Sequence, residues 1–140
     1  MYGLNAIQVS LDTNVWIFGI VGADQFCEKI LFNLSRFEII IPDQVRAELE
    51  RNLSNYDMRQ FYHFILQHGV KIDAERVPST YIAAFEQKGL KKGDAEIGAF
   101  CEWRKIDIIV SDNRDFLKGL SPGQHFQVMS PKIFCETFGL

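Results

Sequence analysis

The chain has 140 residues, of which 47% are hydrophobic and 12 are Phe, so it contains enough apolar material for a core. Its formal net charge of -3 excludes a strongly basic surface over the whole molecule, and any contact with RNA must come from local clusters of Lys and Arg. No apolar run approaches the roughly 18 residues that a membrane helix requires, and the N-terminus lacks a basic signal-peptide start. These features predict one domain over residues 1–140, with no membrane insertion.

Apolar periodicity and Gly or Pro punctuation predict strands that alternate with helices. In chain order, the pattern predicts a strand over 6–11, a helix over 15–22, a helix that Asp24 caps, a strand over 37–41, helices over 43–53 and 57–69, an edge strand over 70–72, helices over 79–89 and 93–105, a strand over 106–112, a strand over 125–130 and a helix over 131–140. Strands separated by helices favour right-handed crossovers and a parallel sheet. We therefore expect an α/β fold, a three-layer α/β/α sandwich with a mainly parallel central sheet of four to five strands.

The three cysteines, Cys27, Cys101 and Cys135, are widely separated and lie among apolar residues. Their odd number and the lack of a CxxC or Cys/His spacing argue against a disulfide framework and against a zinc site. They are predicted to be reduced core residues, and the protein is expected to be cytoplasmic.

Acidic residues fall where several predicted strands end. Asp12 ends the first strand, Glu48 lies in the helix after the second, Asp94 opens the helix "GDAEIGAF", and Asp112 and Asp115 follow the strand that ends in "IIV". In open parallel sheets, ligands bind beyond the carboxyl ends of the strands. Four segments far apart in the sequence are therefore expected to bring carboxylates to one edge of the sheet.

A group of carboxylates at one edge is unstable by itself, because like charges repel unless a cation lies between them. Mg²⁺ and Mn²⁺ bind oxygen ligands, and they are usually held by one or two protein carboxylates together with water and phosphate oxygens. The pattern therefore predicts that Asp12 is a metal ligand held at the rigid end of a strand.

Each acid also has an ordinary structural explanation. Asp12 and Asp94 are good residues for the start of a helix, and Glu48 lies in the charged segment "RAELERN", where an exposed side chain is the usual outcome. The segment "SDNRD" has the composition of a polar turn. None of these motifs is specific alone.

Together, and in this order, the motifs resemble those of PIN domains, the metal-dependent nucleases that include the VapC-type toxins of toxin–antitoxin pairs. The matching stretches are "VSLDTNVWI", "IPDQVRAEL", "LKKGDAEIGAF" and "IIVSDNRDF", which together span most of the chain. The resemblance implies a parallel sheet covered on both faces, Mg²⁺ or Mn²⁺ as cofactor, and single-stranded RNA as substrate.

The resemblance also implies roles for individual residues. Asp12, Glu48 and Asp94 match the first three acidic positions, and Asp12 and Asp94 would bind the metal directly. In the last motif we favour Asp115 as the fourth carboxylate, with Asp112 as the alternative. Three polar residues would support these acids: Asn14, Ser111 and Asn113.

Asn113 is a departure from the family pattern, in which an acid is common at this position; an amide offers an oxygen but no negative charge.

Nearby cations would bind the RNA phosphates, namely Lys91, Lys92, Arg114 and Arg46. The aromatic residues Trp16 and Phe18 could stack on bases, although such residues at helical spacing usually belong to the core.

Two other classes of function remain open at this level. A phosphohydrolase would need a second Asp two residues after Asp12, where the chain has Asn14, and a receiver domain would need an acidic pair near the first strand. A catalytically degenerate PIN module would bind RNA or a protein partner without cleavage.

A VapC-like chain would bind a small antitoxin protein, and apolar residues on the helix "DMRQFYHFILQ" are candidates for that contact or for a homodimer.

Overall fold

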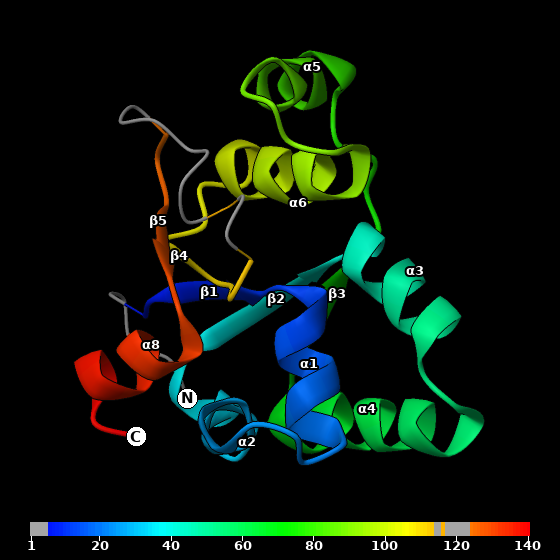
Figure 1. Cartoon of the computed structure of the whole chain (residues 1–140), viewed down its shortest axis with the longest axis vertical. Coiled ribbons are helices and arrows are strands. Elements are labelled where there is room, and N and C mark those ends of the chain that lie inside the picture. Colours follow the sequence, from blue (N-terminus) through cyan, green and yellow to red (C-terminus); the bar gives the residue numbers. More distant parts are fainter. Residues whose placement is uncertain (1–5, 114–115, 117–123) are drawn as a thin grey trace.

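The computed structural model describes residues 6–113, 116 and 124–140, and its strands and helices follow the predicted order (Figure 1). Its strands are β1 (Gln8–Leu11), β2 (Glu38–Pro42), β3 (Lys71–Asp73), β4 (Ile108–Val110) and β5 (Gln127–Met129). Across these described residues the five strands form one sheet in the order β3-β2-β1-β4-β5, and every neighbouring pair is parallel. The α/β class and the parallel sheet are confirmed, with five strands at the upper end of the expected number.

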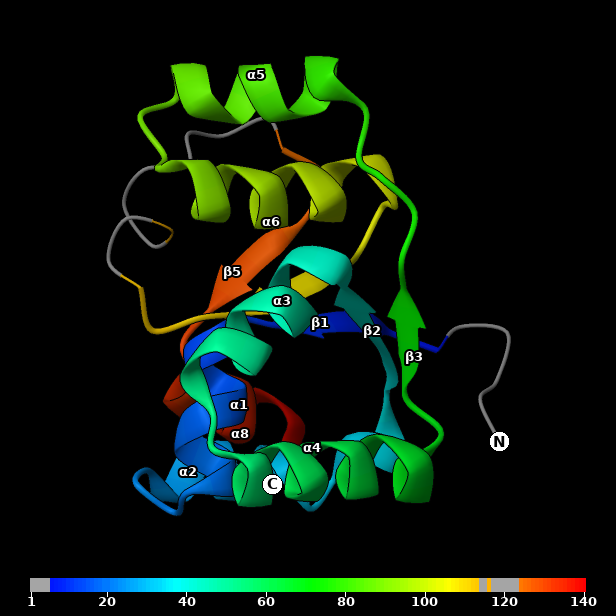
Figure 2. The same ribbon diagram turned by 90° about the vertical axis from the view of Figure 1, so that its right-hand side faces the viewer.

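Helices cover both faces of this sheet. They are α1 (Thr13–Ile20), α2 (Gln25–Leu31), the 3-10 turn η1 (Leu34–Arg36), α3 (Asp43–Asn52), α4 (Asn55–His68), α5 (Ser79–Gln87), α6 (Lys92–Trp103) and α8 (Pro131–Phe138). Figures 1 and 2 show α5 and α6 on one side of the sheet and α1, α2, α4 and α8 on the other, which confirms the three-layer arrangement. In the part of the chain that the structure describes, no helix has the length and hydropathy needed to cross a bilayer.

Local signals explain where several helices begin and end. The Asp24 carboxylate accepts hydrogen bonds from the backbone N–H groups of Phe26 and Cys27, as an N-cap does. Gly69 ends α4 at φ +65°, a conformation that glycine adopts without steric cost. The sequence had suggested that Asp94 opens the helix. The helix α6 instead begins at Lys92, and Asp94 lies within its first turn.

The core lies between the sheet and both helical layers. The central strands β1 and β4 are almost entirely buried, which is typical of parallel strands covered on two faces. Trp16 is fully buried, and its ring meets that of Phe61 edge to face at 5.2 Å, so Trp16 belongs to the core and is not available to stack on a base. All three cysteines are buried and free, as predicted.

The carboxyl ends of the strands meet at one edge, where the polypeptide enters helices directly. β1 continues into α1 through Asp12, and β2 continues into α3 after Pro42. The helix α3 contacts both α1 and α6, so it joins the two helical layers at this edge (Figure 1). The fold thereby brings the start of α1, the side of α3 and the start of α6 close together.

Shortening a side chain in the central sheet tests this packing. Ile109 lies in β4 between β1 and β5 and is completely buried, so Ile109→Ala should lower the free energy of unfolding by about 2–5 kcal/mol through loss of burial and a residual cavity. Ile133→Ala is the matched control: this side chain on α8 is 53% exposed, and the expected change is about 0.5 kcal/mol or less. Equal losses in urea denaturation of the two variants would contradict the arrangement.

Candidate active site at the carboxyl edge of the sheet

Asp12 is held from several directions at the end of β1. Its backbone N–H donates to the carbonyl of Val110 at 2.9 Å, which extends the pairing of β1 with β4. One carboxylate oxygen accepts from the Thr13 N–H at 2.8 Å, and the other accepts from the Ser111 hydroxyl at 2.7 Å. Only 5% of Asp12 is exposed. The residue therefore caps α1 and is also fixed at the edge where ligands bind in parallel sheets.

Glu48 reaches the same place from α3. Its Oε1 accepts from the Thr13 hydroxyl at 2.7 Å, and its Oε2 accepts from Nε2 of Gln44 at 2.7 Å. Thr13 directly follows Asp12, so this one threonine links the two acids. The side chain of Glu48 is thus half-buried and oriented, in contrast to the solvated surface acid that its charged helix first suggested.

Gly93 allows α6 to approach α3 closely. A Cβ atom at this position would lie 2.9 Å from Oε2 of Glu48 and 3.2 Å from Nε2 of Gln44, and real Cβ contacts are essentially never shorter than 3.0 Å. Any larger residue would therefore displace the Glu48 carboxylate. Glycine at 93 keeps Glu48 beside the turn that carries Asp94.

Asn113 connects the two acids that the sequence analysis proposed as metal ligands. Its Nδ2 donates to Oδ2 of Asp94 at 3.0 Å, while its backbone N–H donates to the Ser111 hydroxyl oxygen at 3.0 Å. Because Ser111 in turn donates to Asp12, a continuous chain of hydrogen bonds runs from Asp12 to Asp94. An aspartate side chain at 113 would have no N–H to donate to Asp94 and would repel it, so the amide supports the site at this position.

The electrostatics of the site follow from burial and from like charges. Burial raises the pKa of Asp12 from its ordinary value of 3.8 to about 6. The hydrogen bonds from Ser111 and from the Thr13 N–H oppose this rise, whereas the negative charges of Asp94 and Glu48 add to it. Asp12 is thus a carboxylate whose ionised form lacks sufficient positive charge nearby.

This deficit fits a divalent cation. In the described part of the chain, no three acidic, His or Cys side chains lie close enough together to enclose an ion by themselves. Mg²⁺ does not require such a group, because it is commonly held by one or two carboxylates while water and substrate oxygens fill the other positions. Asp12 and Asp94 offer only oxygen ligands, and a positive charge beside them would stabilise the buried charge of Asp12 and offset its repulsion from Asp94.

The remaining predicted site residues are placed as follows. Asp112 is exposed, and Asn14 is exposed, with no hydrogen bond to Asp12 among the described side chains. Asp115 and Arg114 lie outside the described residues, so the choice between Asp115 and Asp112 as fourth carboxylate stays a prediction. Ser111, by contrast, contacts Asp12 in the manner that was proposed for it.

The predicted RNA-binding cations differ in their surroundings. Lys91 and Lys92 are exposed at the start of α6, next to Asp94. Arg46 instead pairs with Asp43 at 2.7 Å and with Glu50 at 2.9 Å, and its hydrogen bonds to these acids raise its pKa above the usual range. Arg46 is thus partly neutralised within its own helix, and the two lysines are the better placed phosphate ligands.

Sequence reasoning did not single out Thr13, Gln44 or Gly93 as parts of the site. Gln44 precedes Glu48 by four residues, and residues at this spacing on a helix face each other, so helical periodicity could have identified it. Thr13 lies at the helix start that Asp12 predicts, and its contact with Glu48 is not signalled by the sequence. The contact of Gly93 with α3 joins residues far apart in the chain, and no local pattern signals it.

The chain is an all-parallel α/β protein whose linked carboxylates lie at the carboxyl edge of the sheet, the place where ligands bind in this class of fold. A family model described as PIN domain matches residues 9–119. The chain therefore belongs to the PIN domain family. No curated protein sequence matches the chain.

Solved structures show the same fold. A chain in the crystal structure of VapBC2 from Rickettsia felis, bound to a DNA fragment from their promoter, is similar with a TM-score of 0.67 and 19% identity, over 89% of this chain and 100% of that one. A chain in the DNA-bound VapBC structure from Salmonella typhimurium is similar with a TM-score of 0.65 and 18% identity, over 87% of this chain and 98% of that one. A chain in a toxin-antitoxin complex from Klebsiella pneumoniae is similar with a TM-score of 0.63 and 19% identity, over 88% of this chain and 97% of that one.

The charge of Asp12 should be visible in the pH dependence of stability. Because the pKa is about 6 in the folded protein and near 3.8 otherwise, the folded form binds the proton more tightly, and the contribution of Asp12 to stability falls as pH rises between these values. The loss is at most about 3 kcal/mol. Asp12→Asn removes this titration, so in EDTA the variant should gain stability relative to wild type as the pH rises from about 4 to 7.

Urea denaturation of both proteins across this pH range measures the difference directly. The comparison between the two proteins removes the contribution of other titrating groups, which they share. A difference in unfolding free energy that stays constant with pH would show that Asp12 is not desolvated in the folded protein.

Proposed function

We propose that this chain is a metal-dependent endoribonuclease that hydrolyses phosphodiester bonds in single-stranded RNA. The observation that carries the proposal is the continuous hydrogen-bonded chain from Asp12 through Ser111 and Asn113 to Asp94, with Glu48 beside it. Two acids held in this way, with the charge of one unfavourably buried, are suited to a divalent cation. Membership of the PIN family agrees with this, since PIN domains are generally nucleases.

In this proposal Asp12 and Asp94 hold Mg²⁺ or Mn²⁺. When bound, the ion supplies positive charge to the phosphate and makes water more acidic, so that hydrolysis proceeds near neutral pH. Ser111 and Thr13 fix the orientation of Asp12, and Asn113 does the same for Asp94. Such supporting hydrogen bonds determine how well a ligand group is oriented.

Glu48 and the fourth carboxylate would orient the attacking water. The Thr13 hydroxyl and the Gln44 amide each donate to Glu48, which leaves the carboxylate fixed in position beside Asp12. Hydrolysis would add the water oxygen to phosphorus and break the P–O3′ bond. The products would be a 5′-phosphate and a 3′-hydroxyl, with the proton from water transferred to the leaving oxygen.

We further propose that the protein is a VapC-type toxin with a small antitoxin as its partner. The similarity to chains from VapBC complexes supports this, as do apolar side chains exposed on the surface of the helices. Leu66 on α4 is 82% exposed, and Phe32 after α2, 71% exposed, has its ring 6.1 Å from that of Phe64. Exposed apolar residues on neighbouring helices are suited to a protein contact, with an antitoxin or with a second copy of the chain. The free cysteines fit a reducing cytoplasm.

Cleavage of a mixed set of labelled single-stranded RNAs tests the nuclease directly. We expect cleavage with Mn²⁺ or Mg²⁺, none in EDTA, and a loss of at least about a hundredfold in Asp12→Asn and in Asp94→Asn, because each removes a charge from the metal site. Glu136→Gln, an exposed acid on α8, is the control and should cleave like wild type.

The form of the result separates the alternatives. Metal binding should also appear without catalysis, as a rise in melting temperature with Mn²⁺ in wild type that is absent from Asp12→Asn. RNA binding with no cleavage under any metal, and with both variants indistinguishable from wild type, would show that the chain is a non-catalytic PIN module.

Gly93→Ala tests the close approach of α6 to Glu48. Alanine favours a helix by roughly 1 kcal/mol relative to glycine, so the variant should be as stable as wild type or more so. The added Cβ would displace the Glu48 carboxylate, and cleavage should fall by about tenfold or more because small displacements of active groups are costly. Full activity with unchanged stability would show that the position of Glu48 does not matter.

A further inference from the structure

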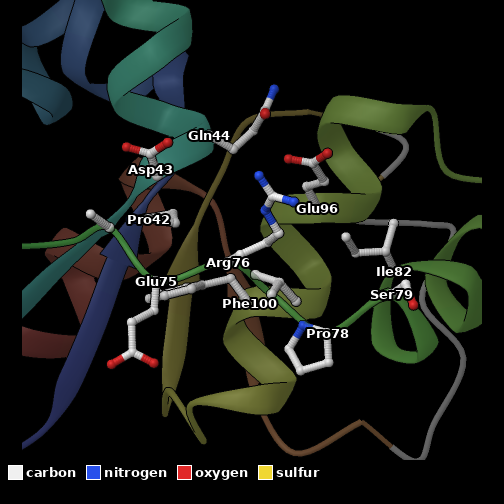
Figure 3. Close-up of a pocket in the computed structure, with 12 residues that line it drawn as sticks. Pro42, Asp43, Gln44, Glu75, Arg76, Pro78, Ser79, Ile82, Glu96 and Phe100 are labelled. Atoms are coloured by element: carbon white, nitrogen blue, oxygen red, sulfur yellow. The ribbon is translucent and has the colours of Figure 1, made fainter.

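A pocket of about 650 Å³ lies next to the acidic site, outside the residues assigned to it so far (Figure 3). Its walls come from the start of α3, from residues 74–78 and from the facing sides of α5 and α6. A volume of this size is within the range of pockets that bind small organic molecules or parts of larger ones. All of its lining residues belong to the described part of the chain.

The pocket adjoins the acidic site at Gln44. This residue lines the pocket, and its Nε2 donates to Glu48 at 2.7 Å. Glu96 lines the pocket from α6, the helix whose first turn carries Asp94, and residues two apart on a helix point to different sides. A strand of RNA whose phosphodiester lies at the acids would therefore have a neighbouring nucleotide within reach of the pocket.

Two charged groups in the pocket have no partner among the described residues. Asp43 is paired with Arg46, and Glu75 with Arg104 at 3.1 Å. Arg76 and Glu96, by contrast, take part in no ion pair and no side-chain hydrogen bond within the described part of the chain. Figure 3 shows the guanidinium of Arg76 directed toward the space in front of Glu96, whereas Glu75 points the other way.

The remaining lining residues are mostly apolar. Pro78 is exposed and Ile82 is partly exposed in the wall of the pocket, and the buried Phe100 of α6 lies behind them (Figure 3). Exposed apolar side chains such as Pro78 and Ile82 can accept the face of a nucleobase, while polar groups at the rim read its edge. Besides the paired acids Asp43 and Glu75, the pocket thus combines one unpaired cation, one unpaired anion and an apolar surface among the described residues.

We propose that this pocket binds a guanine of the RNA next to the cleaved phosphodiester, and this rests on the proposed nuclease function. A carboxylate accepts two hydrogen bonds side by side. Guanine presents two adjacent donors on its Watson–Crick edge, N1–H and the N2 amino group, whereas the other three bases present one donor there. Glu96 therefore selects guanine, and Arg76 binds a phosphate of the same strand.

The charges favour a nucleotide over a basic peptide. A Lys or Arg from a protein partner would satisfy Glu96 but would meet the like charge of Arg76 in the same pocket. A nucleotide matches both groups, because its base donates hydrogen bonds and its phosphate is negative. Selection of a base by a carboxylate and positioning of the backbone by a cation are separate functions, and they can be tested separately.

The first experiment maps cleavage sites in a randomised single-stranded RNA with Mn²⁺, and the second measures binding of labelled RNAs in EDTA by fluorescence anisotropy. We expect guanine to be enriched at one fixed position beside the cleaved bond. Replacing that guanine with inosine removes the N2 amino group and should weaken binding about tenfold. Glu136→Gln serves as the control and should retain the guanine preference.

Two variants separate the roles of the pocket residues. Glu96→Gln replaces the two acceptor oxygens of the carboxylate with one acceptor oxygen and one donor NH₂ group. This pair matches the donor and acceptor on the edge of adenine, so the base preference should shift from guanine toward adenine. Arg76→Ala should weaken binding of all sequences to a similar extent and should reduce the dependence of binding on salt.

The outcomes distinguish this inference from the proposed function. Metal-dependent cleavage with no base preference, or with a preference that Glu96→Gln leaves unchanged, would overturn the guanine pocket and leave the nuclease intact. A wild-type protein that neither binds nor cleaves RNA would overturn both. Retained guanine selection together with loss of a protein partner in Arg76→Ala or Glu96→Gln would assign the pocket to that partner instead.

Discussion

The burial of the Asp12 carboxylate at the end of β1 is the feature on which the site depends. An ionisable group in this position costs stability, which is why burial raises its pKa to about 6. Ser111 and the Thr13 N–H offset part of that cost with hydrogen bonds, but the nearby charges of Asp94 and Glu48 add to it. An unfavourable arrangement of this kind is common at functional sites, where a ligand relieves it.

The parallel sheet determines why these acids meet. All five strands run in the same direction, so β1, β2 and β4 end at the same edge, and α1 and α3 begin there. Thr13 on α1, Glu48 on α3 and Asp94 on α6 come from segments that are distant in the chain, and each is carried by a regular element. Side chains on helices and strands are held more rigidly than those on loops, which favours ligand binding with a defined geometry.

Asn113 shows how a departure from a family pattern can be read from structure. By sequence alone, an amide in place of an acid indicates a weakened metal site. In the structure the amide donates to Asp94 and its backbone supports Ser111, so Asn113 joins the two acids that lie at either end of the chain of hydrogen bonds. The neutral amide donates a hydrogen bond between the acids, whereas a further carboxylate at 113 would increase their repulsion.

The sequence by itself determined the α/β class, the order of strands and helices, and the segments that carry the acids. Those properties depend on local periodicity and on residues such as Asp24 and Gly69, whose effect on a helix end needs no distant partner. The tertiary structure alone decided that Gly93 contacts Glu48, that Arg46 is paired within its own helix, and that Arg76 faces Glu96 in a pocket. Such contacts join residues through the packing of α3, α6 and residues 74–78, and packing between distant segments leaves no signal in a single sequence.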